Sequence, residues 1–351
     1  MPPPPLKSVL AIAVVVGGTA AAFAYTAGWL SPDRISGNRF ANLFQSQAVA
    51  GHRLNHAKGT CFTGTFRATG DGTALSTAPM LASGEYPVVG RFNLGTPNPF
   101  DKDSKPRVRG IGIRIAVPGG QEWRMAMIDP PVFPVSTPAA FYQLLIAGGS
   151  KAPNAMADFA KAHPEIAPFG AWAKDGQRTP SYAEERYNSL DSFLFTAADG
   201  RTRAVRWSIV PEAEVQEIPV EQFEQSGPDV LEREIADRVA KGPAKWTMTV
   251  QVAEAGDPTA DPSKAWPAER QVVTVGEMTV DRIIPEPDGP CRDLNFDPTV
   301  LPSGMSTSDD PFPSARSAVY AKSYDRRTAN AGNYPRDANP YPPAAKTGGA
   351  S

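Results

Sequence analysis

The sequence predicts an α+β fold built around an antiparallel sheet or barrel. Apolar residues alternate with other residues in several runs, and this period of two is typical of strands with one buried face. Helical patterns interrupt the strands without the strict alternation that a parallel α/β sheet needs. The expected strands cover residues 60–67, 111–117, 123–127, 205–209, 246–252 and 271–284.

Four segments show the period of an amphipathic helix. The clearest runs from Asp229 to Ala240, where Leu231, Ile235 and Val239 recur at every fourth position. Proline precedes this segment and glycine follows it, as the ends of helices favour. The other expected helices cover residues 138–146, 154–162 and 189–197.

The composition is that of an ordinary folded protein. A chain of 351 residues with 41% hydrophobic and 21% charged residues forms one large domain or two. Its net charge of −2 provides no basic surface for nucleic acid. The two cysteines, Cys61 and Cys291, form either one disulfide in an oxidising compartment or two separate buried thiols.

The N-terminal segment, residues 1–30, reads as a membrane anchor or a signal segment. Residues 8–30 carry no charge, and at about 1.5 Å per residue they could cross a hydrocarbon core of roughly 30 Å. Lys7 precedes them, which keeps that end in the cytoplasm and exports the body. Residues 22–24 also resemble a signal cleavage site. We therefore expect a periplasmic or otherwise extracytoplasmic domain over residues 31–327, either anchored or secreted, and a disordered tail over 328–351.

The run from Arg53 to Gly59 is the first candidate for chemistry. It contains His56, one of only three histidines in the chain, between Arg53 and Lys58. Histidine is the side chain that exchanges protons most readily near neutral pH. A predicted strand follows at once, so a packing role at a strand entry is the alternative reading.

A second candidate lies near the C-terminus, where Arg316 precedes Tyr320 by four residues. On a helix these two side chains meet on one face. A guanidinium beside a phenol oxygen favours the phenolate, and tyrosine is the proximal haem ligand of catalases. Taken alone, the pair is weak evidence, because arginine and tyrosine four residues apart on a helix usually form a surface stacking contact.

Together the two motifs resemble those of haem catalases. Arg53-x-x-His56-Ala-Lys-Gly resembles their distal-histidine motif, and Arg316-x-x-x-Tyr320 with Arg327 resembles their proximal-tyrosine motif. Further segments resemble the family in the same order along the chain, at residues 90–92, 109–111, 131–133, 207–212 and 297–298. The likeness is strongest to the short, exported catalase-related peroxidases.

This resemblance implies an eight-stranded antiparallel β-barrel with surrounding helices and one haem b (iron protoporphyrin IX) held inside the barrel. His56 would be the distal acid–base catalyst, and Tyr320 the axial ligand of the iron. Asn93 would support His56 by a hydrogen bond to its ring. The other cofactor contacts that the resemblance implies are three propionate-binding arginines, the arginine beside the phenolate and two distal-wall phenylalanines: Arg53, Arg91, Arg327, Arg316, Phe133 and Phe141.

Three positions depart from the family pattern. The distal asparagine of catalases aligns with Ile128, or with Asp129 after a one-residue shift. The serine that supports the distal histidine aligns with Asn93, which can still hydrogen-bond a ring nitrogen. Asn55 replaces the valine beside that histidine. The distal site therefore lacks the amide that helps to place peroxide in catalases.

These departures favour a peroxidase that reduces hydrogen peroxide or organic hydroperoxides with an organic electron donor, with weak catalase activity or none. Three alternatives stay open: a true catalase, a non-catalytic haem-binding module tethered at the membrane, and a haem hydroperoxide isomerase. The chain also lacks the C-terminal extension of full catalases, so we expect a monomer or a small homo-oligomer.

Overall fold

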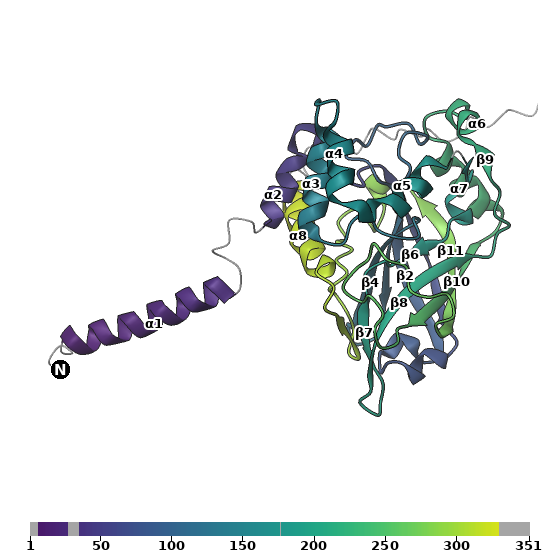
Figure 1. The fold of residues 1–351 in the computed structure, drawn as a ribbon. Helices are drawn as coiled ribbons and strands as arrows, with labels where there is room; N and C mark the ends of the chain where they lie inside the picture. The colour runs from purple at the N-terminus through teal and green to yellow at the C-terminus, as the bar shows by residue number, and fades with distance from the viewer. Residues whose placement is uncertain (1–5, 27–34, 176, 330–351) are drawn as a thin grey trace, which may run out of the picture.

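The computed structural model describes residues 6–26, 35–175 and 177–329. Its helices and strands are drawn in Figure 1. The helices are α1 (Leu6–Thr26), α2 (Gly37–Leu43), α3 (Pro138–Gly149), α4 (Ala155–Ala162), α5 (Ala167–Lys174), α6 (Val220–Gln225), α7 (Val230–Lys241) and α8 (Phe312–Ala329). The strands are β1 (Gly59–Ala68), β2 (Gly84–Leu94), β3 (Arg109–Ala116), β4 (Glu122–Ile128), β5 (Gln177–Arg178), β6 (Tyr187–Asn188), β7 (Phe193–Thr196), β8 (Thr202–Pro211), β9 (Ile218–Pro219), β10 (Ala244–Val252), β11 (Val272–Ile284) and β12 (Met305–Thr307).

Eight of these strands close into an antiparallel barrel. Their order is β10-β11-β1-β2-β3-β4-β6-β8, and β8 pairs with β10 to complete the ring. Strands β7 and β12 extend the sheet beyond β8. The predicted α+β class and the eight-stranded barrel are therefore confirmed.

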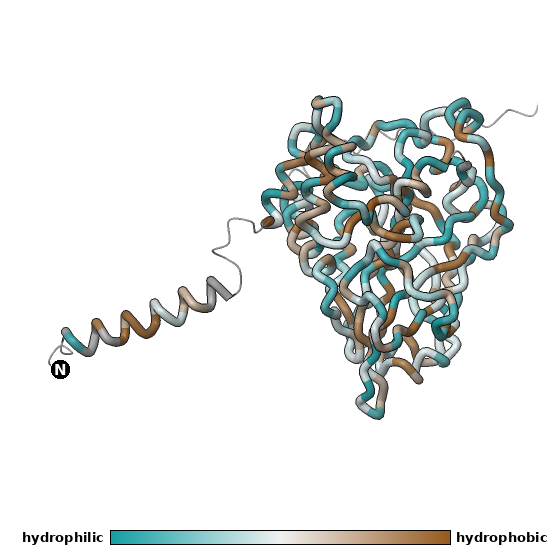
Figure 2. Tube along the Cα trace, in the orientation of Figure 1, coloured by the Kyte–Doolittle hydropathy of each residue, from teal (hydrophilic) through white to brown (hydrophobic). Residues whose placement is uncertain are grey.

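Large aromatic side chains fill the interior of the barrel. They alternate along the strands with residues that face outward, as the pleat requires. An eight-stranded barrel is just wide enough for side chains to fill it. Figure 2 shows hydrophobic residues among the strands and hydrophilic ones along the outer loops. The aromatic side chains of this interior include Phe62, Phe66, Phe92, Trp123, Trp207 and Trp246, each at most 2% exposed.

Helix α8 lies on the outside of the barrel, next to α2 (Figure 1). Arg326 of α8 donates to the Ala41 carbonyl of α2 at 3.2 Å. Phe312, at the first turn of α8, packs against Phe133 with ring centroids 4.8 Å apart. Arg316 of α8 also donates to the Ala126 carbonyl of β4 at 2.7 Å, which holds the helix against the outer face of the barrel.

The six expected strands correspond to β1, β3, β4, β8, β10 and β11, and three of the expected helices correspond to α3, α4 and α7. The helix predicted over residues 189–197 is wrong. The segment forms strand β7, which pairs with β8 and β12. Phe193 and Phe195 are both buried on one face of this strand. Leu190 has φ 58°, a left-handed conformation that is incompatible with a continuous helix. Pairing with two neighbouring strands thus overrides the local helical pattern.

The N-terminal segment forms helix α1, but its membrane interpretation receives no support. Within residues 6–26, 35–175 and 177–329, no helix is both long and apolar enough to cross a membrane. Residues 1–5 and 27–30 of the predicted anchor lie outside the described residues, as do residues 330–351 of the predicted tail. Thr328 and Ala329, assigned to that tail from the sequence, belong to helix α8.

The two cysteines form a disulfide, which settles the alternative left open by the sequence. Cys61 and Cys291 are fully buried, with Cα atoms 5.4 Å apart and 230 residues between them in the chain. The bond connects strand β1 to the loop that follows β11. It therefore fixes this loop against the outer face of the barrel.

Candidate active site

His56 lies in a tight loop that leads into strand β1. Its φ of 53° is in the left-handed region, which costs energy and persists only where the surroundings fix it. Arg91 supplies that support from β2, donating to the carbonyl oxygens of His56 at 2.8 Å and Ala57 at 3.0 Å. Lys58, the next residue, is buried and pairs with Asp103 at 2.6 Å. The chain from His56 to Lys58 is therefore held in place.

Asn93 orients the imidazole of His56. Its Oδ1 lies 2.6 Å from His56 Nδ1, and its Nδ2 donates to the Arg91 carbonyl at 3.4 Å. The amide oxygen therefore accepts the proton carried by Nδ1, which leaves Nε2 as the basic nitrogen.

The electrostatic surroundings keep this imidazole neutral. Burial lowers the pKa of His56 to about 4, against the opposing effect of the Asn93 hydrogen bond. The positive charges of Arg91, Arg316 and Arg53 lower the pKa further. His56 is therefore a proton acceptor at neutral pH.

Helix α8 brings Arg316 and Tyr320 to the same cavity. Asp310 begins the helix by accepting from the Phe312 amide at 2.9 Å, as N-terminal carboxylates do. Arg316 and Tyr320 lie one helical turn apart, and Arg316 Nη2 donates to Tyr320 Oη at 3.1 Å. The same nitrogen donates to the Ala126 carbonyl of β4 at 2.7 Å. The predicted pairing of arginine and phenol is thus present in the structure.

Arg316 is fixed in place by a second contact. Its Nη1 lies 2.5 Å from Asp191 Oδ2. Burial alone would lower the pKa of Arg316, but the electrostatic interactions and hydrogen bonds with Tyr320 and Asp191 outweigh burial and raise it. A permanent positive charge therefore faces the phenol oxygen.

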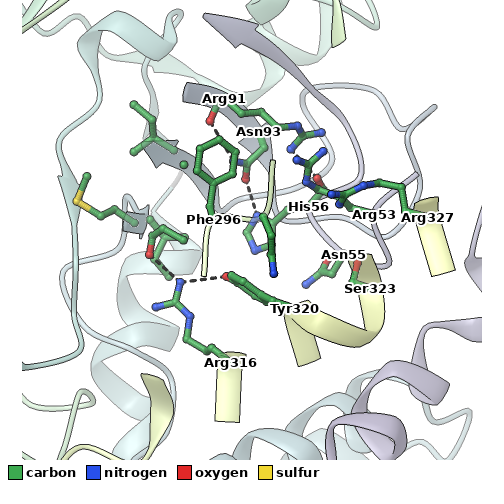
Figure 3. Close-up of a pocket in the computed structure, with 16 residues that line it drawn as sticks. Arg53, Asn55, His56, Arg91, Asn93, Phe296, Arg316, Tyr320, Ser323 and Arg327 are labelled. Atoms are coloured by element: carbon green, nitrogen blue, oxygen red, sulfur yellow. Dashed lines mark hydrogen bonds between the residues drawn. The ribbon is translucent and has the colours of Figure 1, made fainter. Parts of the chain in front are cut away.

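Two adjoining cavities connect His56 with Tyr320. Both side chains line both cavities, and Figure 3 shows them in one of the two. The residues common to the two cavities are Asn55, His56, Ala126, Ile128, Arg316, Tyr320 and Ser323.

The cavities lie outside the barrel, whereas the resemblance implies a cofactor inside it. The inner face of β2 carries Phe92, which is packed among the interior aromatics. Arg91 and Asn93, the neighbours of Phe92, point the opposite way and line the cavity. Because aromatic side chains already fill the interior, the open space is left between the outer face of the barrel and helix α8.

Three arginines gather at one end of the cavity, as the sequence predicts (Figure 3). Arg53 and Arg91 both pair with Glu286, which is buried among them. Burial would raise the pKa of Glu286, but Arg91 and Arg53 outweigh burial and lower it. Arg327 is 5% exposed, and its Nε and Nη2 have no hydrogen-bond partner among the described residues. Glu286 and Asp293 offset part of the positive charge of the three arginines, which leaves a net positive charge for an anionic ligand.

Aromatic side chains form the opposite wall. Phe133 and Phe141 line the larger cavity, with ring centroids 5.0 Å apart. Ile128 also lines it, whereas Asp129 does not. Asp129 instead accepts from the Arg109 amide at 2.8 Å and pairs with Arg107 at 3.2 Å. The structure therefore places the apolar Ile128 at the distal position and excludes the shifted alternative.

Sequence reasoning missed three residues of the site. Glu286 follows β11, and no local pattern marks it as the partner of distant arginines. Ser323 accepts from the Leu54 amide at 3.2 Å, and its spacing of three from Tyr320 on a helix could have revealed it. Phe296 lies over Gly112, where a Cβ atom would come within 2.7 Å of the ring. A glycine inside a strand is the available signal for such a close approach.

Comparison with known proteins gives consistent matches. A family model described as catalase matches residues 41–344. The catalase-related peroxidase of Synechococcus elongatus is 34% identical over 284 residues, covering 79% of this chain and 84% of the relative. The catalase-related peroxidase of Mycolicibacterium paratuberculosis is 36% identical over 284 residues, covering 80% of this chain and 90% of the relative.

A solved structure shares the fold. The crystal structure of a fungal catalase superposes with a TM-score of 0.70 at 18% identity, covering 83% of this chain and 61% of that one. Since the family model spans most of the chain, and two relatives above 30% identity cover about four fifths of it, the chain belongs to the catalase family.

Proposed function

We propose that this protein is a haem-dependent peroxidase that reduces hydrogen peroxide or organic hydroperoxides with electrons from a small organic donor. The observation that carries the proposal is that His56 and Tyr320 line the same cavity. One is a neutral imidazole oriented by Asn93, and the other is a phenol held against Arg316. The relatives named catalase-related peroxidase support the same class of reaction.

The residues of the cavity fit a haem b. Tyr320 would ligate the iron through its phenol oxygen, since tyrosine is the proximal haem ligand of catalases. The net positive charge at the arginine end would match the two propionates, and the nitrogens of Arg327 that have no hydrogen-bond partner among the described residues would donate to them. The rings of Phe133 and Phe141 would contact the apolar part of the macrocycle. When bound, the haem supplies the redox-active iron at which the peroxide bond is broken.

His56 would carry the proton transfer. Nε2 of the neutral imidazole takes the proton from one peroxide oxygen and returns it to the other, which then leaves as water or alcohol. The hydrogen bond from Nδ1 to Asn93 fixes the ring plane during both transfers. The left-handed backbone at His56 is held by Arg91, so the ring keeps its position as the proton moves.

Ile128 favours a peroxidase over a catalase. It lines both cavities beside His56 and provides no donor to hold a second hydrogen peroxide. Together with Phe133 and Phe141 it makes an apolar distal wall that suits the alkyl group of an organic hydroperoxide. A true catalase is the second candidate, because the family model described as catalase matches residues 41–344.

The disulfide supports a location outside the cytoplasm. Such bonds persist in oxidising compartments and are rare in the cytosol. We therefore propose that the folded domain functions in an extracytoplasmic compartment.

One experiment separates the candidates. Protein loaded with ferric haem is mixed with an organic hydroperoxide and an aromatic donor, and donor oxidation is followed by absorbance. Oxygen evolution from hydrogen peroxide without donor is measured in parallel. A peroxidase oxidises the donor and evolves little oxygen. Rapid oxygen evolution without donor oxidation would establish the catalase instead. Neither reaction would leave a haem-binding module or a hydroperoxide isomerase, which analysis of the products formed without donor distinguishes.

Replacing His56 should abolish most turnover. We expect His56→Ala to lower the peroxide-dependent rate by about 10²–10⁴-fold, because the acid–base group is lost, while the haem spectrum is kept. His163→Ala is the matched control, since His163 contacts Gln143 and Glu165 away from the cavity. Equal rates in the two variants would rule out the role of His56.

The rate should depend on pH through His56. Its pKa of about 4 keeps the imidazole in the base form above that value. We expect the second-order rate constant for peroxide to be constant between about pH 8 and about pH 5, and to fall as the pH drops through about 4. A decline centred near 6.5, the ordinary histidine pKa, that disappears in His56→Ala would contradict this assignment.

Replacing Tyr320 should weaken the hold on haem. We expect Tyr320→Phe to lower haem affinity by at least roughly tenfold, since even outer-shell changes cost that much at metal sites, and to shift the absorbance bands. Tyr324→Phe, one turn further along α8, serves as the control and should leave both unchanged. An unaltered spectrum in Tyr320→Phe would show that Tyr320 is not the ligand.

A further inference from the structure

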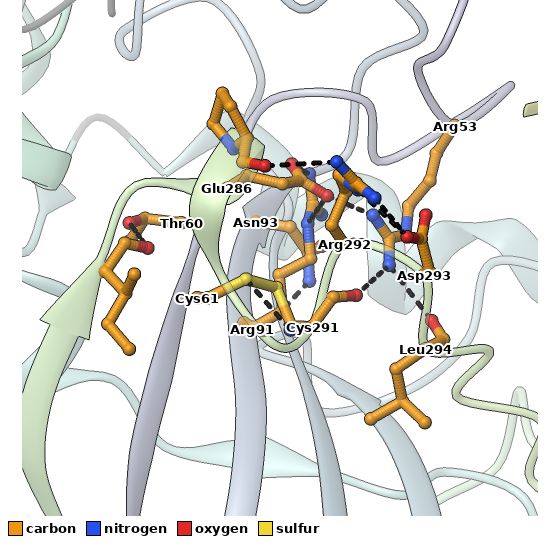
Figure 4. The surroundings of a disulfide bond; sticks show 12 residues. Arg53, Thr60, Cys61, Arg91, Asn93, Glu286, Cys291, Arg292, Asp293 and Leu294 are labelled. Carbon is orange, nitrogen blue, oxygen red and sulfur yellow. Dashed lines mark hydrogen bonds and ion pairs between the residues drawn. A yellow bond between two sulfur atoms is a disulfide. The ribbon is translucent and has the colours of Figure 1, made fainter. Parts of the chain in front are cut away.

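The loop from Glu286 to Leu294 is joined to the barrel by the disulfide (Figure 4). Cys61 pairs directly with Arg91 in the β1–β2 register, so the bond lies beside a cavity arginine. The backbone of the loop approaches the disulfide closely, because a Cβ atom at Gly289 would lie 2.3 Å from Cys61 Sγ. The Cys291 amide also donates to Cys61 Sγ at 3.2 Å.

Three contacts tie Arg53 to this loop. Its Nη2 donates to the carbonyl oxygens of Cys291 at 3.0 Å and Leu294 at 3.1 Å. Its Nη1 pairs with Glu286. Arg53 itself comes from the chain before β1, far from this loop in the sequence. Cys291 contributes both the disulfide and one of the acceptors, which links the bond directly to the position of this guanidinium.

The same loop holds Arg91. Glu286 accepts from Nε at 2.9 Å and from Nη2 at 2.7 Å, which is the two-pronged geometry of strong arginine–carboxylate pairs. The remaining nitrogen, Nη1, donates to the His56 carbonyl. Loop, arginine and distal histidine thus form one connected series of hydrogen bonds.

We propose that the disulfide-anchored loop 286–294 is a positioning element for the cofactor carboxylates. By holding Arg53 and Arg91 side by side, it presents two guanidinium groups together with Arg327 at the end of the cavity. Without the loop, like charges would separate these long side chains and the carboxylates would have to order them on binding. This inference rests on the proposed haem function. It also gives the disulfide a role in cofactor binding, because the bond anchors the loop that holds the two arginines.

The test compares two ligands that differ only at the carboxylates. Ferric haem and its dimethyl ester, which lacks both negative charges, are titrated by absorbance into the haem-free wild type and into Cys61→Ser/Cys291→Ser. We expect the double variant to bind haem roughly tenfold to a hundredfold more weakly and the ester almost as well as the wild type does. The preference for haem over the ester therefore falls.

A second variant moves the loop without removing the bond. Gly289→Ala keeps both cysteines and Glu286 but places a methyl group against Cys61, so it should lower the same preference. The control is Glu185→Gln, which breaks a buried pair with Arg109 at 2.7 Å and does not line the described cavities. It should lower the thermal midpoint and leave the preference unchanged.

The outcomes are distinguishable. If the double variant and Gly289→Ala lose affinity for haem and ester equally, the effect is general destabilisation and the positioning role is wrong. An unchanged preference in both variants overturns the inference as well, although haem binding itself stands. If the wild type binds neither ligand, the proposed haem function fails.

Discussion

The outward face of strand β2 is the constraint on which the site depends. Arg91 and Asn93 share this face because they are two residues apart, and Phe92 between them is buried inside the barrel. Asn93 orients the His56 ring, and Arg91 holds the His56 backbone. The hydrophobic burial that fixes the register of β2 therefore also fixes the distal side of the cavity.

Helix α8 forms the opposite side of the cavity. Its side chains are brought together by the spacing of a helix, not by the alternation of a strand. Arg316, Tyr320, Ser323 and Arg327 follow at spacings of four, three and four, which places them on one stripe of the helix. All four line a cavity. Docking against α2 and against the loop before β1 sets the distance between this stripe and the barrel. The cavity is thus the gap between the outward face of β2 and helix α8, and most of the polar side chains that line it come from these two elements and the loop before β1.

Much of this arrangement could be predicted from the sequence, because the spacing of apolar residues differs between strands and helices. Cys61 and Cys291 could not be paired in advance, since 230 residues separate them and proximity arises only when the barrel closes. Glu286 is hidden for the same reason. The position of the cavity outside the barrel also depends on the three-dimensional filling of the interior by aromatic side chains. The strand at Phe193 was misassigned because its pairing partners are distant in sequence.

The central claim is that one haem lies between His56 and Tyr320. The most direct test is a crystal structure of the protein after loading with ferric haem. The account predicts the macrocycle outside the barrel, with the Tyr320 oxygen bonded to iron, His56 over the opposite face and the propionates at Arg53, Arg91 and Arg327. Haem bound elsewhere, or iron ligated by any other side chain, would contradict it.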